Sequence, residues 1–169
     1  MAALTVMTRY HTSWRWMLAA IPFVAACTSY TPPDTLPGMD RAAVIARMGP
    51  PDTELRLASG TRLEFPSGPY GKHTWFVYLD AAGRATRAEQ VLTDRNFARV
   101  VPGMSQDDVR QLLGRPGETY SLARDRGVVW SYRYDNQICL WFQVEIAADK
   151  TVRSAGNGPL PECNPRMQD

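Results

Sequence analysis

The sequence has few of the residues that build metal centres and catalytic dyads. It contains two histidines and three cysteines among 169 residues, and His73 is the only histidine after residue 26. No Cys-x-x-Cys, His-Glu-x-x-His, Gly-x-Ser-x-Gly or Gly-rich phosphate-binding pattern occurs. A Cys-His catalytic pair that uses His73 is a weaker interpretation than an exposed loop histidine. These absences favour a protein that is not an enzyme and that holds no metal or cofactor.

Long apolar runs and an excess of one charge are also missing. The longest uncharged apolar run near the N-terminus, residues 16–26, is shorter than the ~20 residues that a membrane-spanning helix needs. Residues 1–26 contain Arg9 and Arg15 and no acid, so the 19 basic residues fall to 17 beyond them, against 17 acidic ones. A chain with this neutral balance offers no basic surface to nucleic acid.

The N-terminus instead carries the features of an export signal. Basic residues precede the apolar run, which ends in Val24-Ala25-Ala26-Cys27 and resembles the lipobox of bacterial lipoproteins. We therefore expect residues 1–26 to be a signal peptide, with Met1 or Met7 as its start. Cys27 would carry a diacylglyceryl group on its thiol and a further acyl chain, such as palmitate, on its amine. The alternative is an ordinary cleaved signal in which Cys27 occurs by chance.

Residues 27–37 are rich in Pro and Thr, which predicts an extended, semi-rigid tether. Residue 28 is Thr rather than Asp. In lipoproteins with such a cleavage site, Asp there favours retention in the inner membrane. We expect anchoring in the outer membrane, with the chain facing the periplasm.

An internal repeat dominates the rest of the chain. Two blocks share Pro-Gly-Met, a mid-helix Val and Gly-x-Pro at a constant offset of 103 − 38 = 65 residues. The positions are Gly38, Met39, Val44, Gly49 and Pro51 in the first block, and Gly103, Met104, Val109, Gly114 and Pro116 in the second. Asp40 and Ser105 are typical helix N-caps, and the glycines fit helix ends followed by a proline. Each block therefore predicts one short helix with both ends marked.

Strand-like segments follow each helix. We expect strands near residues 53–57, 62–65, 74–79 and 84–92, then near 119–123, 128–134, 138–146 (the longest) and 151–154, with a short helix at 94–100 between the halves. The prediction is an α+β fold with two tandem modules, residues 38–100 and 101–169, each a helix followed by an antiparallel sheet. Trp75 and Trp130 are interpreted as equivalent, which places ten extra residues around 66–72 in the first half.

Two cysteines remain beyond Cys27. In an oxidising compartment Cys139 and Cys163 are expected to pair. Closing that loop would stabilise the fold by ~3 kcal/mol and hold the Pro-rich C-terminal tail against the strand that contains Cys139.

The second block, with Trp130-Ser131-Tyr132 after it, resembles the BamE (SmpA/OmlA) family, and the first block resembles it more loosely through Trp75. The resemblance implies a lipid-anchored outer-membrane protein that assists the machinery folding β-barrel proteins. Two tandem modules are also similar to the β-lactamase inhibitor proteins, which clasp an enzyme with a concave sheet.

The leading hypothesis is an envelope scaffold in outer-membrane protein assembly or envelope integrity, which binds proteins of the β-barrel assembly machinery. The alternative is a module that captures a periplasmic enzyme. Either role needs an open sheet face, which could carry Trp130, Tyr132 and Tyr134 or, on the other side, Trp141.

Overall fold

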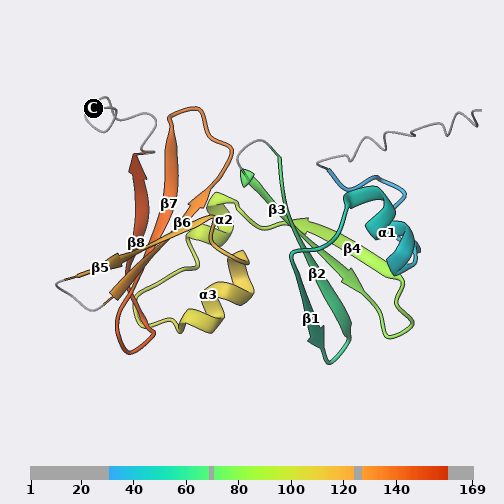
Figure 1. Cartoon of the computed structure of the whole chain (residues 1–169), viewed down its shortest axis with the longest axis horizontal. Helices are drawn as coiled ribbons and strands as arrows, with labels where there is room; N and C mark the ends of the chain where they lie inside the picture. Colours follow the sequence, from blue (N-terminus) through green and yellow to red (C-terminus); the bar gives the residue numbers. More distant parts are fainter. Residues whose placement is uncertain (1–30, 69–70, 124–126, 160–169) are drawn as a thin grey trace, which may run out of the picture.

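The computed structural model describes residues 31–68, 71–123 and 127–159. It contains two four-stranded antiparallel sheets, and in each sheet the strands follow one another in sequence order (Figure 1). The first half contains α1 (Arg41–Met48), β1 (Thr53–Leu57), β2 (Gly60–Ser67), β3 (His73–Leu79) and β4 (Ala85–Gln90). The second half contains α2 (Asp94–Phe97), α3 (Gln106–Leu113), β5 (Glu118–Leu122), β6 (Gly127–Arg133), β7 (Leu140–Ile146) and β8 (Val152–Pro159). The predicted α+β fold with two similar modules is confirmed.

Both principal helices begin and end at the predicted residues. The Asp40 carboxylate accepts a hydrogen bond from the Ala43 amide at 2.8 Å, and the Ser105 hydroxyl accepts one from the Asp108 amide at 3.1 Å. Each bond satisfies a donor of the first helical turn that has no partner within the helix. Gly49 and Gly114 end the helices with φ of 83° and 77°, a conformation that side chains with a Cβ rarely adopt.

The Pro-Gly-Met segments tie each helix to the last strand of its own sheet. Gly38 donates to the Ala85 carbonyl at 2.7 Å, and Ala85 donates back to the Met39 carbonyl at 2.7 Å. Gly103 and Met104 exchange the same two bonds with Val152, both at 2.8 Å. The repeated sequence therefore marks a repeated connection between the start of the helix and the sheet.

The two sheets also repeat, and their register corrects one prediction. Gly60 opens β2 as Gly127 opens β6, an offset of 127 − 60 = 67 residues, and both sheets shift register at the equivalent place, after Tyr78 and after Glu145. At this offset Trp75 of β3 corresponds to residue 142 in β7, whereas Trp130 lies in β6. The predicted equivalence of Trp75 and Trp130 is wrong, and the first half has no ten-residue insertion.

Two strand predictions are also wrong. The strand expected from residue 138 begins at Leu140, because the Asn136 side chain accepts from the amides of Ile138 and Leu140 and holds residues 136–139 in a loop. Strand β7 is therefore not the longest. Strand β8 has eight residues, where only a short edge at 151–154 was expected.

Each sheet buries one face against its own helix. In the first half, Val44 of α1 packs on Leu63, Val77 and Leu79, and Leu36 from the predicted tether joins this core. In the second half, Val109 and Leu113 of α3 pack on the sheet together with Trp130, Tyr132, Tyr134, Phe142, Val144 and Ile146. This second core also includes residues from the segment that precedes α3: Val91, Leu92, Phe97 and Val100. The sequence analysis had assigned that segment to the first module.

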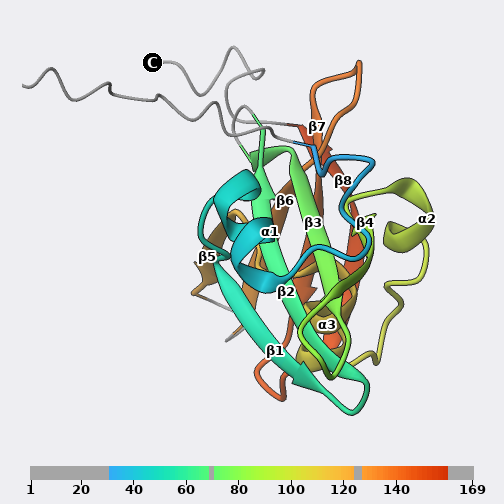
Figure 2. The ribbon, with the colours of Figure 1, turned by 90° about the vertical axis from the view of Figure 1, so that its right-hand side faces the viewer.

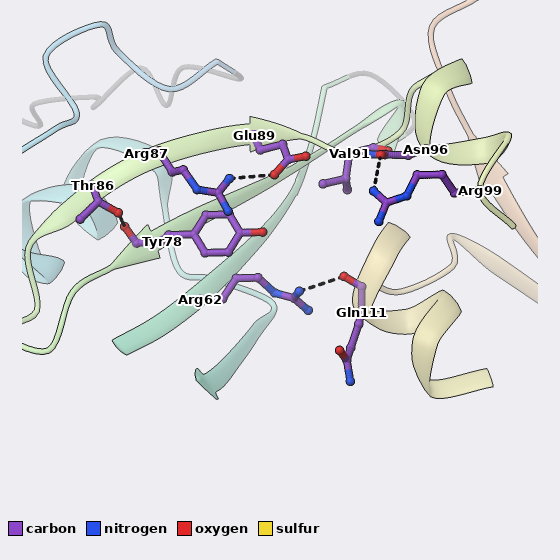
Figure 3. A network of polar contacts seen from close by, with 9 residues as sticks. All are labelled: Arg62, Tyr78, Thr86, Arg87, Glu89, Val91, Asn96, Arg99 and Gln111. Carbon is purple, nitrogen blue, oxygen red and sulfur yellow. Dashed lines mark hydrogen bonds and ion pairs between the residues drawn. The ribbon is translucent and has the colours of Figure 1, made fainter. Parts of the chain in front are cut away.

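Helix α3 also covers the opposite face of the first sheet, so it lies between the two sheets (Figures 1 and 2). A Cβ at Gly114 would lie 3.1 Å from the Phe76 ring and 3.2 Å from Thr74. The Arg62 guanidinium of β2 donates to the Gln111 carbonyl of α3 at 2.9 Å, as Figure 3 shows. The two modules therefore share one helix rather than meeting through loops.

A buried ion pair lies under α3. Arg62 and Glu64 are bonded at 2.6 Å, with side chains only 6% and 4% exposed, and the Arg62 guanidinium stacks 4.0 Å from the centre of the Phe76 ring. A charge held so far from water is tolerated only while its partners remain in place. This pair makes the contact between the sheet and α3 sensitive to small changes.

Alanine at the two helix-ending glycines measures the contact between the modules. Gly49→Ala introduces only backbone strain, about 1–3 kcal/mol, since nothing lies within 4 Å of its added Cβ. Gly114→Ala has a similar φ and adds a clash with the first sheet, so we expect a larger loss of unfolding free energy in urea titrations. Equal losses in the two variants would contradict the close packing of α3 on that sheet.

Two neighbouring ion pairs allow a matched comparison of charge burial. Glu64→Gln leaves the buried Arg62 without a countercharge, so it should lower the unfolding free energy by about 3 kcal/mol. Glu89→Gln breaks the Arg87–Glu89 pair, whose side chains are 55% and 41% exposed, and should cost less than about 1 kcal/mol. Thermal and urea unfolding of both variants tests this order.

Candidate protein-binding face

One face of the second sheet is covered by no element in the described part of the chain. Helices α2 and α3 pack on its inner face, and the first sheet is covered by α1 on one side and by α3 on the other. We call the opposite side of the second sheet the outer face. The strand register assigns to it Glu118, Tyr120, Leu122, Val129, Ser131, Arg133, Trp141, Gln143, Glu145, Ser154, Gly156 and Gly158.

The outer face is hollowed over its centre. A depression of about 380 Å³ is lined by Tyr120, Val129, Gln143, Ser154 and Gly156, among others. Tyr120 is 48% exposed, and Gly156 contributes no side chain. An exposed aromatic residue beside a hollow with a small-residue floor is typical of a surface that receives a protein partner.

Charges on this face are paired with one another. Arg133 bonds Glu118 at 3.0 Å, and Arg153 bonds Glu145 at 2.5 Å. The Ser154 hydroxyl donates to the other oxygen of Glu145 at 3.0 Å. The face therefore presents polar groups of both signs around Tyr120, and it suits a partner of mixed surface polarity rather than a polyanion.

A second hollow, of about 400 Å³, lies where the first sheet meets α3. Figure 3 shows that Glu89 and Arg99, which line it, are engaged with neighbours. Glu89 accepts from Arg87, which stacks 3.5 Å from the centre of the Tyr78 ring, and Arg99 bonds Asn96. This hollow lies at the contact between the modules, and these charged side chains are already paired.

The structure decides between the two aromatic faces that the sequence left open. Trp130, Tyr132 and Tyr134 are buried in the core beneath α2 and α3. Burial raises the pKa of the Tyr132 hydroxyl, which stays protonated and donates to the Gly114 carbonyl at 3.2 Å. Trp141 lies on the outer face, yet it is only 4% exposed and donates to the Pro159 carbonyl at 3.0 Å. Tyr120, rather than a tryptophan, is thus the accessible aromatic residue of this face.

The predicted lipid and disulfide sites fall largely outside the described residues. Cys27 and Cys163 both lie there. Cys139 is disulfide-bonded, and its pairing with Cys163 stays a prediction. Among the described residues, no helix is long and apolar enough to cross a membrane.

Sequence reasoning missed the residues that set the two faces apart. Arg62 and Glu64 alternate with the apolar Leu63 and Phe65, a pattern that predicts an exposed polar side. Nothing in that pattern indicates a helix from forty residues further along. Gly156 was missed as well, since a glycine in an edge strand gives no sign of the hollow above it.

Comparison with known families adds to this geometry. Residues 89–138 match the family model described as the outer membrane protein assembly factor BamE domain. The match runs from the end of β4 through α2, α3, β5 and β6 into the loop before β7. Comparison with curated proteins finds no match to the chain. The helix that joins the two sheets therefore lies inside the segment that is similar to the BamE domain.

Proposed function

We propose that this protein is a lipid-anchored accessory factor in the assembly of outer-membrane proteins. Cys27 would hold it on the periplasmic side of the outer membrane, and it would act by binding protein partners rather than by catalysis. The match to the BamE domain carries this proposal. The lipobox-like Val24-Ala25-Ala26-Cys27 supports the lipid anchor, and Thr28 in place of Asp favours the outer membrane.

The outer face of the second sheet is the binding surface that we assign to this function. It is the sheet face that no described element covers, it is hollowed, and it exposes Tyr120. An accessory factor fixed by a tether needs residues that remain accessible after folding. On the outer face these are Tyr120, Ser154 and Gly156, whereas Val129, Ser131 and Trp141 are buried beneath their neighbours.

Affinity purification from mild-detergent extracts tests the function. Tagged wild-type protein should retain subunits of the β-barrel assembly machinery, identified by mass spectrometry. The Cys27→Ala variant should lose them, since the protein is no longer held at the membrane. Recovery of a soluble periplasmic enzyme in place of those subunits would favour the inhibitor-like alternative and would refute the assembly role.

Two exposed residues make a matched test of the surface. Tyr120 and Val101 are 48% and 50% exposed, so aspartate at either position should change the unfolding free energy by only about 0.5 kcal/mol. Tyr120→Asp places a charge on the outer face and should weaken partner binding by about 2 kcal/mol, roughly 30-fold. Val101→Asp, in the connection between α2 and α3, should bind as the wild type does. Equal retention of partners by both variants would exclude the outer face.

A further inference from the structure

The outer face of the second sheet is the structural counterpart of the face on which α3 lies in the first sheet. With the offset of 67 residues, Arg62, Phe76, Tyr78 and Glu89 correspond to Val129, Gln143, Glu145 and Gly156. The pairing is the same in both sheets: Phe76 faces Glu89 as Gln143 faces Gly156. The repeat therefore identifies a second copy of a surface that already receives a helix within this chain.

The hollow lies at the place that corresponds to the seat of α3. On the first sheet, Phe76 approaches Gly114 of the helix end and Arg62 bonds the Gln111 carbonyl. Their counterparts Gln143 and Val129 line the hollow on the second sheet, together with Gly156. The depression thus lies over the strands that carry a helix in the first module.

We propose that the outer face of the second sheet docks an α-helix of a partner protein, in the way that the first sheet docks α3. The proposal rests on the proposed function for the use of this surface and adds the kind of element that it binds. The helix would lie across β6 and β7, with Tyr120 of β5 and the side-chain-free Gly156 of β8 on either side of it.

The chemistry of the seat differs from that of the first sheet, and this difference constrains the partner. The first sheet presents the buried pair Arg62–Glu64, whereas the equivalent positions here are Val129 and Ser131. Gln143 brings an amide that donates to the Ser131 hydroxyl at 3.4 Å. The seat therefore lacks the buried ion pair of the first sheet, but the exposed pairs Arg133–Glu118 and Arg153–Glu145 flank it. It suits an amphipathic helix whose docking side carries small, apolar and polar residues.

Photo-crosslinking in the full-length chain tests the proposal. A photoreactive phenylalanine derivative placed at Tyr120, Gln143 or Ser154 in turn should attach to one segment of the partner protein. The attached residues, mapped by mass spectrometry, should be spaced by three or four positions, because such residues share one side of a helix. The same derivative at Val101 serves as the control and should not attach to that segment.

Attachment at every second residue of the partner would mean that an extended strand binds here. Attachment to residues 41–48 would mean that a second copy of this chain binds here. Either result overturns the proposal. The spacing is independent of the partner's identity. A helical pattern on a protein outside the assembly machinery would refute the proposed function and leave the helix seat intact.

A steric block provides a second measurement. A Cβ at Gly156 would meet nothing within 4 Å, so Gly156→Trp should leave the unfolding midpoint unchanged while its ring fills the hollow. Crosslinking from Tyr120 should then be lost, whereas Val101→Trp should leave it unchanged. Undiminished crosslinking in a folded Gly156→Trp protein would show that no helix occupies the hollow.

Discussion

Helix α3 packs on two sheets at once, and the arrangement of both modules depends on that double contact. One side of the helix places Val109 and Leu113 in the core of the second sheet. Its other side and its closing glycine rest on Phe76 and Thr74 of the first sheet. A short helix gains most of its stability from such packing rather than from its own hydrogen bonds. The two halves should therefore unfold together, although each has its own core.

This shared helix makes the two modules unequal. The first sheet is covered on both sides, by α1 and by α3. The second sheet is covered on its inner side alone within the described residues. A tandem repeat that stacks one unit on the next leaves its last unit with an open face. The asymmetry follows from the order of the modules along the chain, and it sets the outer face apart as the surface available to a partner.

The sequence predicted what is determined by neighbours along the chain. The helix ends followed from Asp40, Ser105, Gly49 and Gly114, because capping involves atoms within a few residues of one another. The equivalence of Trp75 and Trp130 failed, since an aromatic residue in a strand does not specify which strand of a sheet it occupies. Glycines at turns, such as Gly60 and Gly127, identify equivalent positions of the two sheets more reliably than these tryptophans do.

The features that the sequence did not reveal depend on contacts between distant residues. The alternation in β2 distinguishes two sides of a strand but does not identify what covers the polar one, so the burial of Arg62 and Glu64 under α3 could not be foreseen. The open side of the second sheet was equally undetermined, because Trp130 and Tyr132 of β6 lie on one side whereas Trp141 of β7 lies on the other. The burial of Arg62 and Glu64 depends on a helix more than forty residues further along the chain. The open side of the second sheet depends on how the whole sheet packs.

The charged seat of α3 also affects how the chain folds as it emerges from its N-terminus. The N-terminal half emerges first, so α1 is available to cover the apolar side of the first sheet as soon as its strands pair. The side that must wait for α3 bears Arg62, Glu64, Arg87 and Glu89 around Phe76 and Tyr78, so its apolar area is smaller than that of the side that α1 covers. Exposed apolar surface on a partly folded chain promotes aggregation. The order of the elements therefore limits such surface at the stage when only the first half of the protein has folded.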